Sequence, residues 1–261
     1  MKRLLLLSCI ALTIHAPVFA EPALTQQQIQ AVLTHQDRPA EDNKRDLARR
    51  PAKVLAFSDV AAGDHVLDLF AGGGWYTELL AKSVGDAGKV YAQNDQVIWR
   101  FAEKGITERT KNNRLSNVVR FDNMSIVDMT IPDASLDMAF VALNYHDLFF
   151  THSTRDGKKV QLRDEIVDYK AALATIKKAL KADGTFIIID HFASSGSGYQ
   201  AANTLHRIDP NIVKFQLEEA GFVLIEEANY LRNPTDDLNK NVFAPDTRGK
   251  TDRFIYKFAK K

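Results

Sequence analysis

The sequence predicts an α/β fold, a doubly wound and mostly parallel sheet of seven strands whose last strand is antiparallel. Strand-like and helix-like segments alternate along most of the chain, and such alternation is typical of a parallel sheet with helices on both faces. The first strand leads through three consecutive glycines into a helix. The last two strands, 222–227 and 253–258, have no convincing helix between them, so they are expected to pair antiparallel.

The first strand and helix lie in the stretch VLDLFAGGGWYTELLAKS, residues 66–83. Its apolar start predicts a buried strand over 65–70. Trp75, Leu79 and Leu80 recur at helical spacing and Gly85 is a stop signal, which predicts a helix over 75–84. The other strands are expected at 88–93, 117–121, 136–143, 185–190, 222–227 and 253–258, and the other helices from Pro51 to near Gly63 and at 96–112, 163–181 and 210–220.

The composition fits one globular domain. Of the 261 residues 45% are hydrophobic, and 34 Lys and Arg face 33 Asp and Glu. A balance this even gives no general attraction for nucleic acid. We expect a helical extension over 21–50 followed by the main domain over 51–261, and a small molecule as the partner; the oligomeric state is left open.

Residues 1–20 have the pattern of a secretory signal peptide. Lys2 and Arg3 precede an apolar run, and Val18-Phe19-Ala20 ends the segment with small residues at the positions that a signal peptidase requires. The run is too short to span a bilayer. We therefore expect cleavage after Ala20, export to the periplasm, and no membrane span in the mature chain. Cys9, the only cysteine, would be removed with the signal.

Three glycines in succession lose much chain entropy on folding, so they indicate a turn that needs positive φ or close approach to a ligand. Together with the antiparallel last pair, the turn resembles that of the class I S-adenosylmethionine-dependent methyltransferases, over about residues 50–260. Their fold is Rossmann-like and their cofactor is S-adenosylmethionine. In that family an acidic residue and a Gly-x-Gly-x-Gly turn bind the cofactor's amino-acid portion. Here these positions correspond to Asp68 and to Gly72, Gly73 and Gly74, with Phe70 in the first glycine place.

The resemblance implies further cofactor contacts. The residue after the second strand, Asn94 or Asp95, would bind the ribose, and Asp122 or Asn123 would lie near the adenine. Asn144 would follow the fourth strand, whose end faces the methyl group. A narrower resemblance, to exported predicted methyltransferases of unknown substrate, rests on the motifs LNYHD, IIIDH, TLHRIDP and RGKTDRF.

Ligands of parallel sheets gather at the carboxyl ends of the strands, and a histidine near neutral pKa suits proton removal there. His146 is the first candidate for the base and His191 the second, although either could simply bind a strand-end carbonyl. Tyr145 could stack on substrate or cofactor, or pack in the core. His206 and Arg207 could bind an anionic substrate, or simply lie at the start of the capped helix that follows.

Two other functions stay open. A non-catalytic binding protein could retain the fold, and a nicotinamide-dependent oxidoreductase would use a related turn, although Thr77 stands where that fingerprint requires glycine or alanine. A metal site from His146, Asp147, His191 and His206 lacks the spacing of a zinc signature, so no metal is expected. Arg248, Lys250 and Arg253 are expected on a solvated surface, and residues 228–252 form a loop long enough for a lid.

Overall fold

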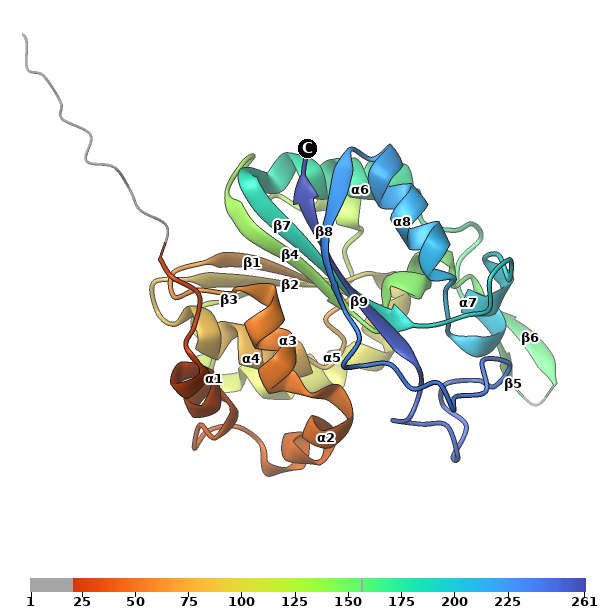
Figure 1. Cartoon of the computed structure of the whole chain (residues 1–261), viewed down its shortest axis with the longest axis horizontal. Helices are drawn as coiled ribbons and strands as arrows, with labels where there is room; N and C mark the ends of the chain where they lie inside the picture. Colours follow the sequence, from red (N-terminus) through yellow and green to blue (C-terminus); the bar gives the residue numbers. More distant parts are fainter. Residues whose placement is uncertain (1–20, 156) are drawn as a thin grey trace, which may run out of the picture.

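The structure, a computed structural model, describes residues 21–155 and 157–261 (Figure 1). The expected signal peptide lies outside this range. A seven-stranded sheet has the order β3-β2-β1-β4-β7-β9-β8. Only β9 runs antiparallel to its neighbours, which confirms the predicted fold class. The strands are β1 (His65–Leu69), β2 (Lys89–Asn94), β3 (Val118–Asp122), β4 (Leu136–Ala142), β7 (Leu180–His191), β8 (Phe222–Ala228) and β9 (Arg253–Lys260).

Helices cover both faces of the sheet. In Figure 1, α1, α3, α4 and α5 lie on one side of the sheet, and α6 and α8 lie on the other. The α-helices are α1 (Gln26–Leu33), α2 (Asp46–Arg49), α3 (Pro51–Ser58), α4 (Trp75–Val84), α5 (Gln96–Thr110), α6 (Tyr169–Ala179), α7 (Gln200–Leu205) and α8 (Pro210–Glu219). Short 3₁₀ helices are η1 (Ala40–Arg45), η2 (Lys111–Asn113), η3 (Ile126–Asp128) and η4 (Tyr145–Phe149).

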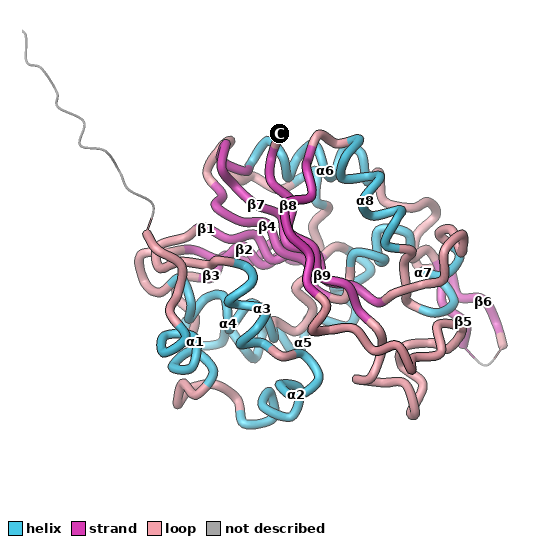
Figure 2. The backbone as a smooth tube through the Cα atoms, viewed as in Figure 1, coloured by secondary structure: helices cyan, strands magenta, loops and turns pink. Residues whose placement is uncertain are grey.

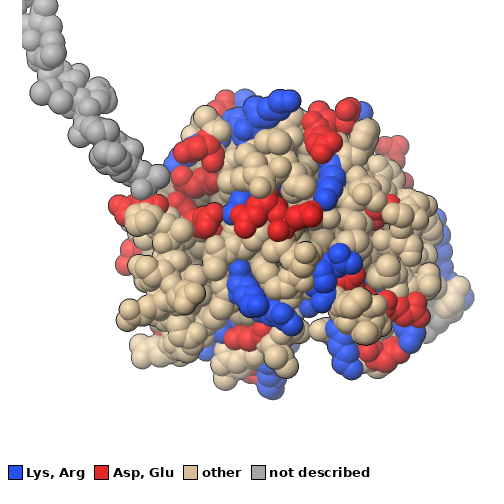
Figure 3. All heavy atoms as spheres, viewed as in Figure 1, with Lys and Arg blue, Asp and Glu red and all other residues tan. Residues whose placement is uncertain are grey.

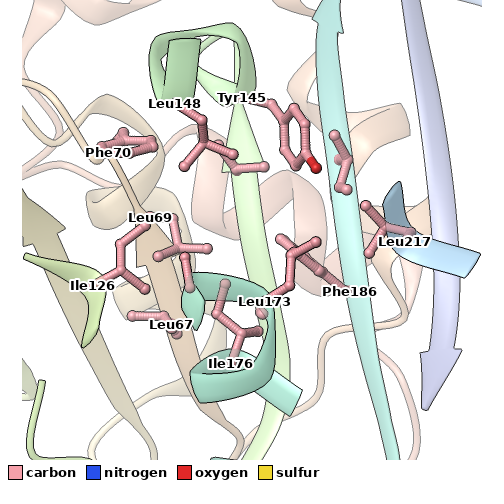
Figure 4. Close-up of a cluster of buried hydrophobic side chains, with 14 of the residues drawn as sticks. Leu67, Leu69, Phe70, Ile126, Tyr145, Leu148, Leu173, Ile176, Phe186 and Leu217 are labelled. Atoms are coloured by element: carbon pink, nitrogen blue, oxygen red, sulfur yellow. The ribbon is translucent and has the colours of Figure 1, made fainter. Parts of the chain in front are cut away.

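Alternate residues of the strands enter two hydrophobic clusters. On β1, Val66 belongs to the cluster that includes α3 and α4, whereas Leu67 and Leu69 belong to the cluster that includes α6 and α8. This alternation is the two-residue period of a strand whose faces are both covered. Figure 4 shows the second cluster, in which Phe70 and Tyr145 are buried beside side chains of β1, α6 and η4.

The segment before the sheet is tied to the main domain by polar contacts. Trp75 Nε1 donates to the backbone oxygen of Asp42, and Arg109 Nη1 lies 2.7 Å from Asp42 Oδ2. Arg253 Nη2 at the start of β9 donates to the backbone oxygen of Ala48. Residues 40–49 therefore stand beside the carboxyl ends of β7 and the amino end of β9.

Some elements differ from the expectation. Helix α6 begins at Tyr169, so residues 163–168 are not helical as predicted, and β7 begins at Leu180, before the expected turn. The hairpin of β5 (His152–Arg155) and β6 (Lys158–Gln161) and the short α7 were not expected. Figure 2 shows the hairpin at one end of the molecule, and the long loop after β8 beside the strand ends. In the described ranges, no helix combines the length and the apolar composition needed to cross a bilayer.

Candidate functional site at the strand ends

The strand ends bring most of the predicted site residues to one edge of the sheet. Parallel pairing sets Asn94 beside Asp122, and Asp190 and His191 end β7 next to β4. The hydrogen bonds and ion pairs of each side chain decide which of them are available to a ligand.

Asp68 lies near the carboxyl end of β1, and only 2% of the residue is exposed. Its Oδ2 accepts a 2.6 Å hydrogen bond from the Thr77 hydroxyl. Burial raises the pKa of the Asp68 carboxyl to about 7, although the Thr77 hydrogen bond and the positive charge of Arg49 oppose this shift. A buried carboxylate with one neutral hydrogen-bond donor is suited to a cationic ligand group.

Two structural features explain why the turn at residues 72–74 consists of glycines. Gly72 and Gly74 have positive φ, and a Cβ on Gly74 would come within 2.8 Å of both Ile106 and Arg109. Gly73 contacts Gly105 of α5 so closely that a Cβ on Gly105 would lie 2.9 Å from the Gly73 Cα. A Cβ on Gly72 would meet no atom within 4 Å, so the turn is open at Gly72 and closed against α5 at Gly73 and Gly74.

Asn94 closes onto the same turn. Its Oδ1 accepts from the Gly72 backbone N–H at 2.8 Å, and its Nδ2 donates to the Gly72 oxygen. Asn94 is fully buried. Its side chain therefore fixes the turn, and this contact uses the atoms that the resemblance assigned to the ribose.

A cavity of about 500 Å³ lies beside the ends of β2 and β3. Asp95 and Asn123 line it, together with Arg163 from the non-helical segment before α6. Asp95 Oδ1 caps α5 by accepting from two backbone N–H groups, and Asp95 Oδ2 pairs with Arg163 Nη2 at 2.9 Å. Asp122 does not line the cavity, and both of its carboxylate oxygens accept hydrogen bonds from Arg120. The sequence left Asn94 or Asp95 open for the ribose and Asp122 or Asn123 for the adenine. Of these, Asp95 and Asn123 are the residues that line the cavity.

His146 lies in η4, just after β4, and is buried. Its Nδ1 lies 2.9 Å from Asp190 Oδ1, and its Nε2 lies 3.6 Å from Asp147 Oδ1. Burial alone would lower the pKa of His146, but the carboxylates of Asp190 and Asp147 outweigh it and raise the pKa to about 9. His146 is therefore an imidazolium at neutral pH, and it cannot accept a proton there.

His191 ends β7 and has the opposite electrostatic environment. Its Nδ1 lies 2.7 Å from the Thr251 hydroxyl. Burial, with the positive charges of His146 and Arg253, lowers the pKa of His191 well below its usual range. The ring is neutral at pH 7 and lines a second cavity, of about 270 Å³. Of the two histidines predicted as bases, only His191 is neutral at pH 7, but its lowered pKa makes it a weaker proton acceptor than a histidine whose pKa is near neutral.

His206 lies beside His146, with ring centroids 5.4 Å apart. Burial, and then the positive charge of His146, lowers the pKa of His206 to about 3. Ligand atoms of His146, Asp147 and His206 all lie within 4.8 Å of one another, so these three residues could hold a metal ion. His191 is not part of this group. The expectation that the protein has no metal stays a prediction.

The remaining predicted residues are occupied by protein contacts. Tyr145 is buried, and its hydroxyl donates to Gln216 Oε1. Asn144 Nδ2 donates to Asp147 Oδ2. Arg207 is fully buried, and its guanidinium binds the Asp236 carboxylate and the backbone oxygens of Phe192 and Lys240. Arg207 therefore holds the loop after β8 instead of presenting a free guanidinium to a substrate.

Several solved structures with a similar fold are methyltransferases. One is a SAM-dependent methyltransferase from Aquifex aeolicus, with a TM-score of 0.57 and 21% identity over 90% of this chain and 99% of that chain. Our chain has the fold of these enzymes. A chain from the complex formed with the Haloferax volcanii Trm112 methyltransferase activator has a TM-score of 0.54 and 13% identity, over 91% and 99% of the two chains. No family model and no curated protein matches the sequence.

Arg163 and Arg49 line the two cavities, and the sequence interpretation assigned a function to neither. Arg163 was placed inside an expected helix, and Arg49 in a charged stretch that fits a solvated helix face. The only sequence signal for Arg49 was the density of charge over residues 41–50, which does not distinguish a binding site from a surface.

Proposed function

We propose that the protein is an S-adenosylmethionine-dependent methyltransferase that acts on a small molecule. The observation that carries the proposal is the neutral, buried His191 in the wall of a small cavity at the strand ends of a methyltransferase fold. The cavity volume of about 270 Å³ suits a small acceptor better than a macromolecule. The balanced overall charge supports the same substrate class.

The residues present fit most of the cofactor. Asp68 would hold the ammonium group, and the open side of Gly72 would receive the amino-acid portion. Asp95 and Asn123 would bind the nucleoside in the larger cavity. S-adenosylmethionine, when bound, supplies a methyl group on a positively charged sulfur. Asn94 is bound to Gly72, so we assign the ribose contact to Asp95, whose carboxylate would accept from the ribose in addition to its contacts with the start of α5 and with Arg163.

We assign the proton transfer to His191. His191 would take the proton that the acceptor's nucleophilic atom loses on methylation. In the tautomer that donates Nδ1–H to the Thr251 hydroxyl, Nε2 is the nitrogen that accepts this proton. His146 was the first candidate from the sequence, but as an imidazolium it holds a proton and a positive charge between Asp190 and Asp147.

Calorimetry with S-adenosylhomocysteine tests the cofactor assignment. Asp68→Asn is expected to weaken binding by at least about tenfold, roughly 1.4 kcal/mol, because it removes the charge that faces the ammonium group. The same change should raise the free energy of unfolding at pH 8. The Asp68 carboxyl has a pKa of about 7 in the folded protein and about 4 in the unfolded chain, so its ionisation lowers the free energy of unfolding as the pH rises through this range. Asparagine does not ionise, so the variant avoids this loss.

Asp133→Asn, at an exposed residue that pairs with Lys178, is the matched control and should leave binding unchanged. Equal binding by wild type and Asp68→Asn would contradict the role of Asp68. Binding of a nicotinamide cofactor in place of S-adenosylhomocysteine would favour an oxidoreductase, and cofactor binding without transfer would favour a non-catalytic binding protein.

Elemental analysis of the same sample tests the prediction that the protein has no metal. A stoichiometric metal that is present in the wild type and lost in His206→Ala would overturn this prediction.

We also propose that the protein is exported and cleaved after Ala20, on the pattern of residues 1–20. Mass spectrometry of protein recovered from the cell envelope should then give Glu21 as the first residue. Recovery of the chain from the cytosol with Met1 retained would contradict export.

A further inference from the structure

All of the charged residues that line the cavity at His191 are basic. Its charged residues are Lys44, Arg45, Arg49, Arg248 and Arg253, and no acidic residue lines it. They come from η1, α2, the loop after β8 and the start of β9, which are far apart in the sequence. In Figure 3, Lys and Arg side chains gather in the lower centre of the face that Figure 1 shows, where α2 and α3 approach that loop.

The carboxylates around the cavity are already bound by other arginines. Asp46 pairs with Arg38, Asp42 with Arg109, Asp236 with Arg207 and Asp252 with Arg232. Among the described residues, Arg45, Arg49, Arg248 and Arg253 form no ion pair with a carboxylate. Arg253 is only 8% exposed, and its guanidinium donates to the backbone oxygens of Thr251 and Ala48. Two of these cations, Arg49 and Arg253, are therefore partly desolvated without an ion-paired carboxylate, an arrangement that costs free energy in the unliganded protein.

Arg49 is held in place by aromatic rings. Its guanidinium carbon lies 4.7 Å from the centroid of Trp75 and 5.5 Å from that of Tyr76. Burial lowers the pKa of Arg49, and the positive charges of Arg45 and Arg253 add to this effect. A stacked guanidinium keeps its edge free for two parallel hydrogen bonds to a planar or tetrahedral oxyanion.

We propose that this cavity binds an oxyanion group, a carboxylate or a phosphate, of the methyl acceptor. The inference rests on the proposed function and deepens it, because it names the substrate class. An anion among these arginines would lie in the same cavity as His191 and would therefore fix the acceptor beside the base. The oxyanion could also be the cofactor's own carboxylate, so the test must separate these two sources.

The test is calorimetric titration of the mature protein with inorganic phosphate and with citrate at low ionic strength. Arg49→Gln is expected to weaken anion binding by at least about tenfold, whereas Arg49→Lys, which keeps the charge but not the paired donors, should weaken it less. Arg49 also packs on Trp75, so its loss could disturb the fold. The double variant Arg45→Gln, Arg248→Gln changes two exposed side chains and should show a comparable loss in a stable protein.

The matched control is Lys104→Gln with Lys178→Gln, which removes the same charge from exposed positions outside the cavity. It should change anion affinity by less than about twofold. An equal loss in this control would mean attraction by net charge alone, and no anion binding by wild type would also overturn the inference.

A second titration with saturating S-adenosylhomocysteine separates the sources. Simultaneous binding of phosphate and S-adenosylhomocysteine supports an acceptor site. Displacement of phosphate by S-adenosylhomocysteine would assign the arginines to the cofactor's carboxylate and overturn the acceptor site. If phosphate binds at the arginines but S-adenosylhomocysteine does not bind at all, the anion site stands and the proposed methyl transfer fails.

Discussion

Replacing His191 by alanine is expected to lower the rate of methyl transfer by about a hundredfold to ten-thousandfold, the usual contribution of a positioned base. The affinity for S-adenosylhomocysteine should stay within about twofold, because the proposed cofactor contacts lie at Asp68, Gly72, Asp95 and Asn123. The measurement is transfer of a labelled methyl group to a metabolite extract, paired with calorimetry. A large loss of turnover with retained cofactor affinity would identify a group that acts on the acceptor.

His191→Gln is the control for packing, because glutamine fills much of the same space and can still contact Thr251 but cannot act as a base near neutral pH. It should be as inactive as His191→Ala. Turnover restored by glutamine would show that His191 positions the site through hydrogen bonding alone. Turnover equal to wild type in both variants would remove His191 from the mechanism and leave the fold unaffected.

The free energy of unfolding is expected to fall by about 3 kcal/mol between pH 7 and pH 10 through the loss of the His146 proton. Asp190 and Asp147 raise the pKa of His146 from 6.5 to about 9 in the folded protein, against the effect of burial. A raised histidine pKa stabilises the folded state fully below about pH 6.5, and this contribution is lost as the pH rises through about 9.

Urea unfolding across this pH range, for wild type and His146→Gln, provides the measurement. Glutamine does not titrate, so the difference between the two proteins isolates His146 from the lysines and tyrosines that also titrate at high pH. Asp68, whose pKa is about 7, still titrates in part above pH 7, but both proteins contain it and its contribution cancels in the difference. A pH dependence in His146→Gln equal to that of wild type would show that His146 is not the imidazolium of an ion pair.

The fold was predictable because its signals are local. Glycines 72 to 74 mark the first turn, and the Asp209-Pro210 pair begins α8 with a capped first turn. The expected helix over 163–181 was wrong in its first six residues, where Arg163 pairs with Asp95. The sequence of residues 163–168 does not reveal that Arg163 pairs with Asp95, which is almost seventy residues away. The prediction therefore rested on helical periodicity alone and began the helix too early.

The candidate site was predictable in its location but not in its contacts. The structure brings most of the candidate residues together at the carboxyl ends of the strands, as the sequence predicts, whereas the availability of each side chain depends on tertiary contacts. Asn94 is bound by a backbone N–H of the turn before it, and Arg207 by a loop after it. The cavity at His191 is lined by residues from 44–49 and from 248–253, which are far apart in the sequence. Patterns in a single sequence contain no information on which distant segments lie together.

The four hydrogen bonds of Arg207 have a consequence for the access of the proposed acceptor to the strand ends. The guanidinium joins the loop after β8 to the backbone that follows β7, and none of its surface is exposed to solvent. Because this buried ion pair lies near the centre of the loop, we expect the loop to move with the sheet and not to open and close as a lid. Under the proposed methyl transfer, acceptors would then be selected by their size and shape at a preformed opening, with no closing motion of this loop before each turnover.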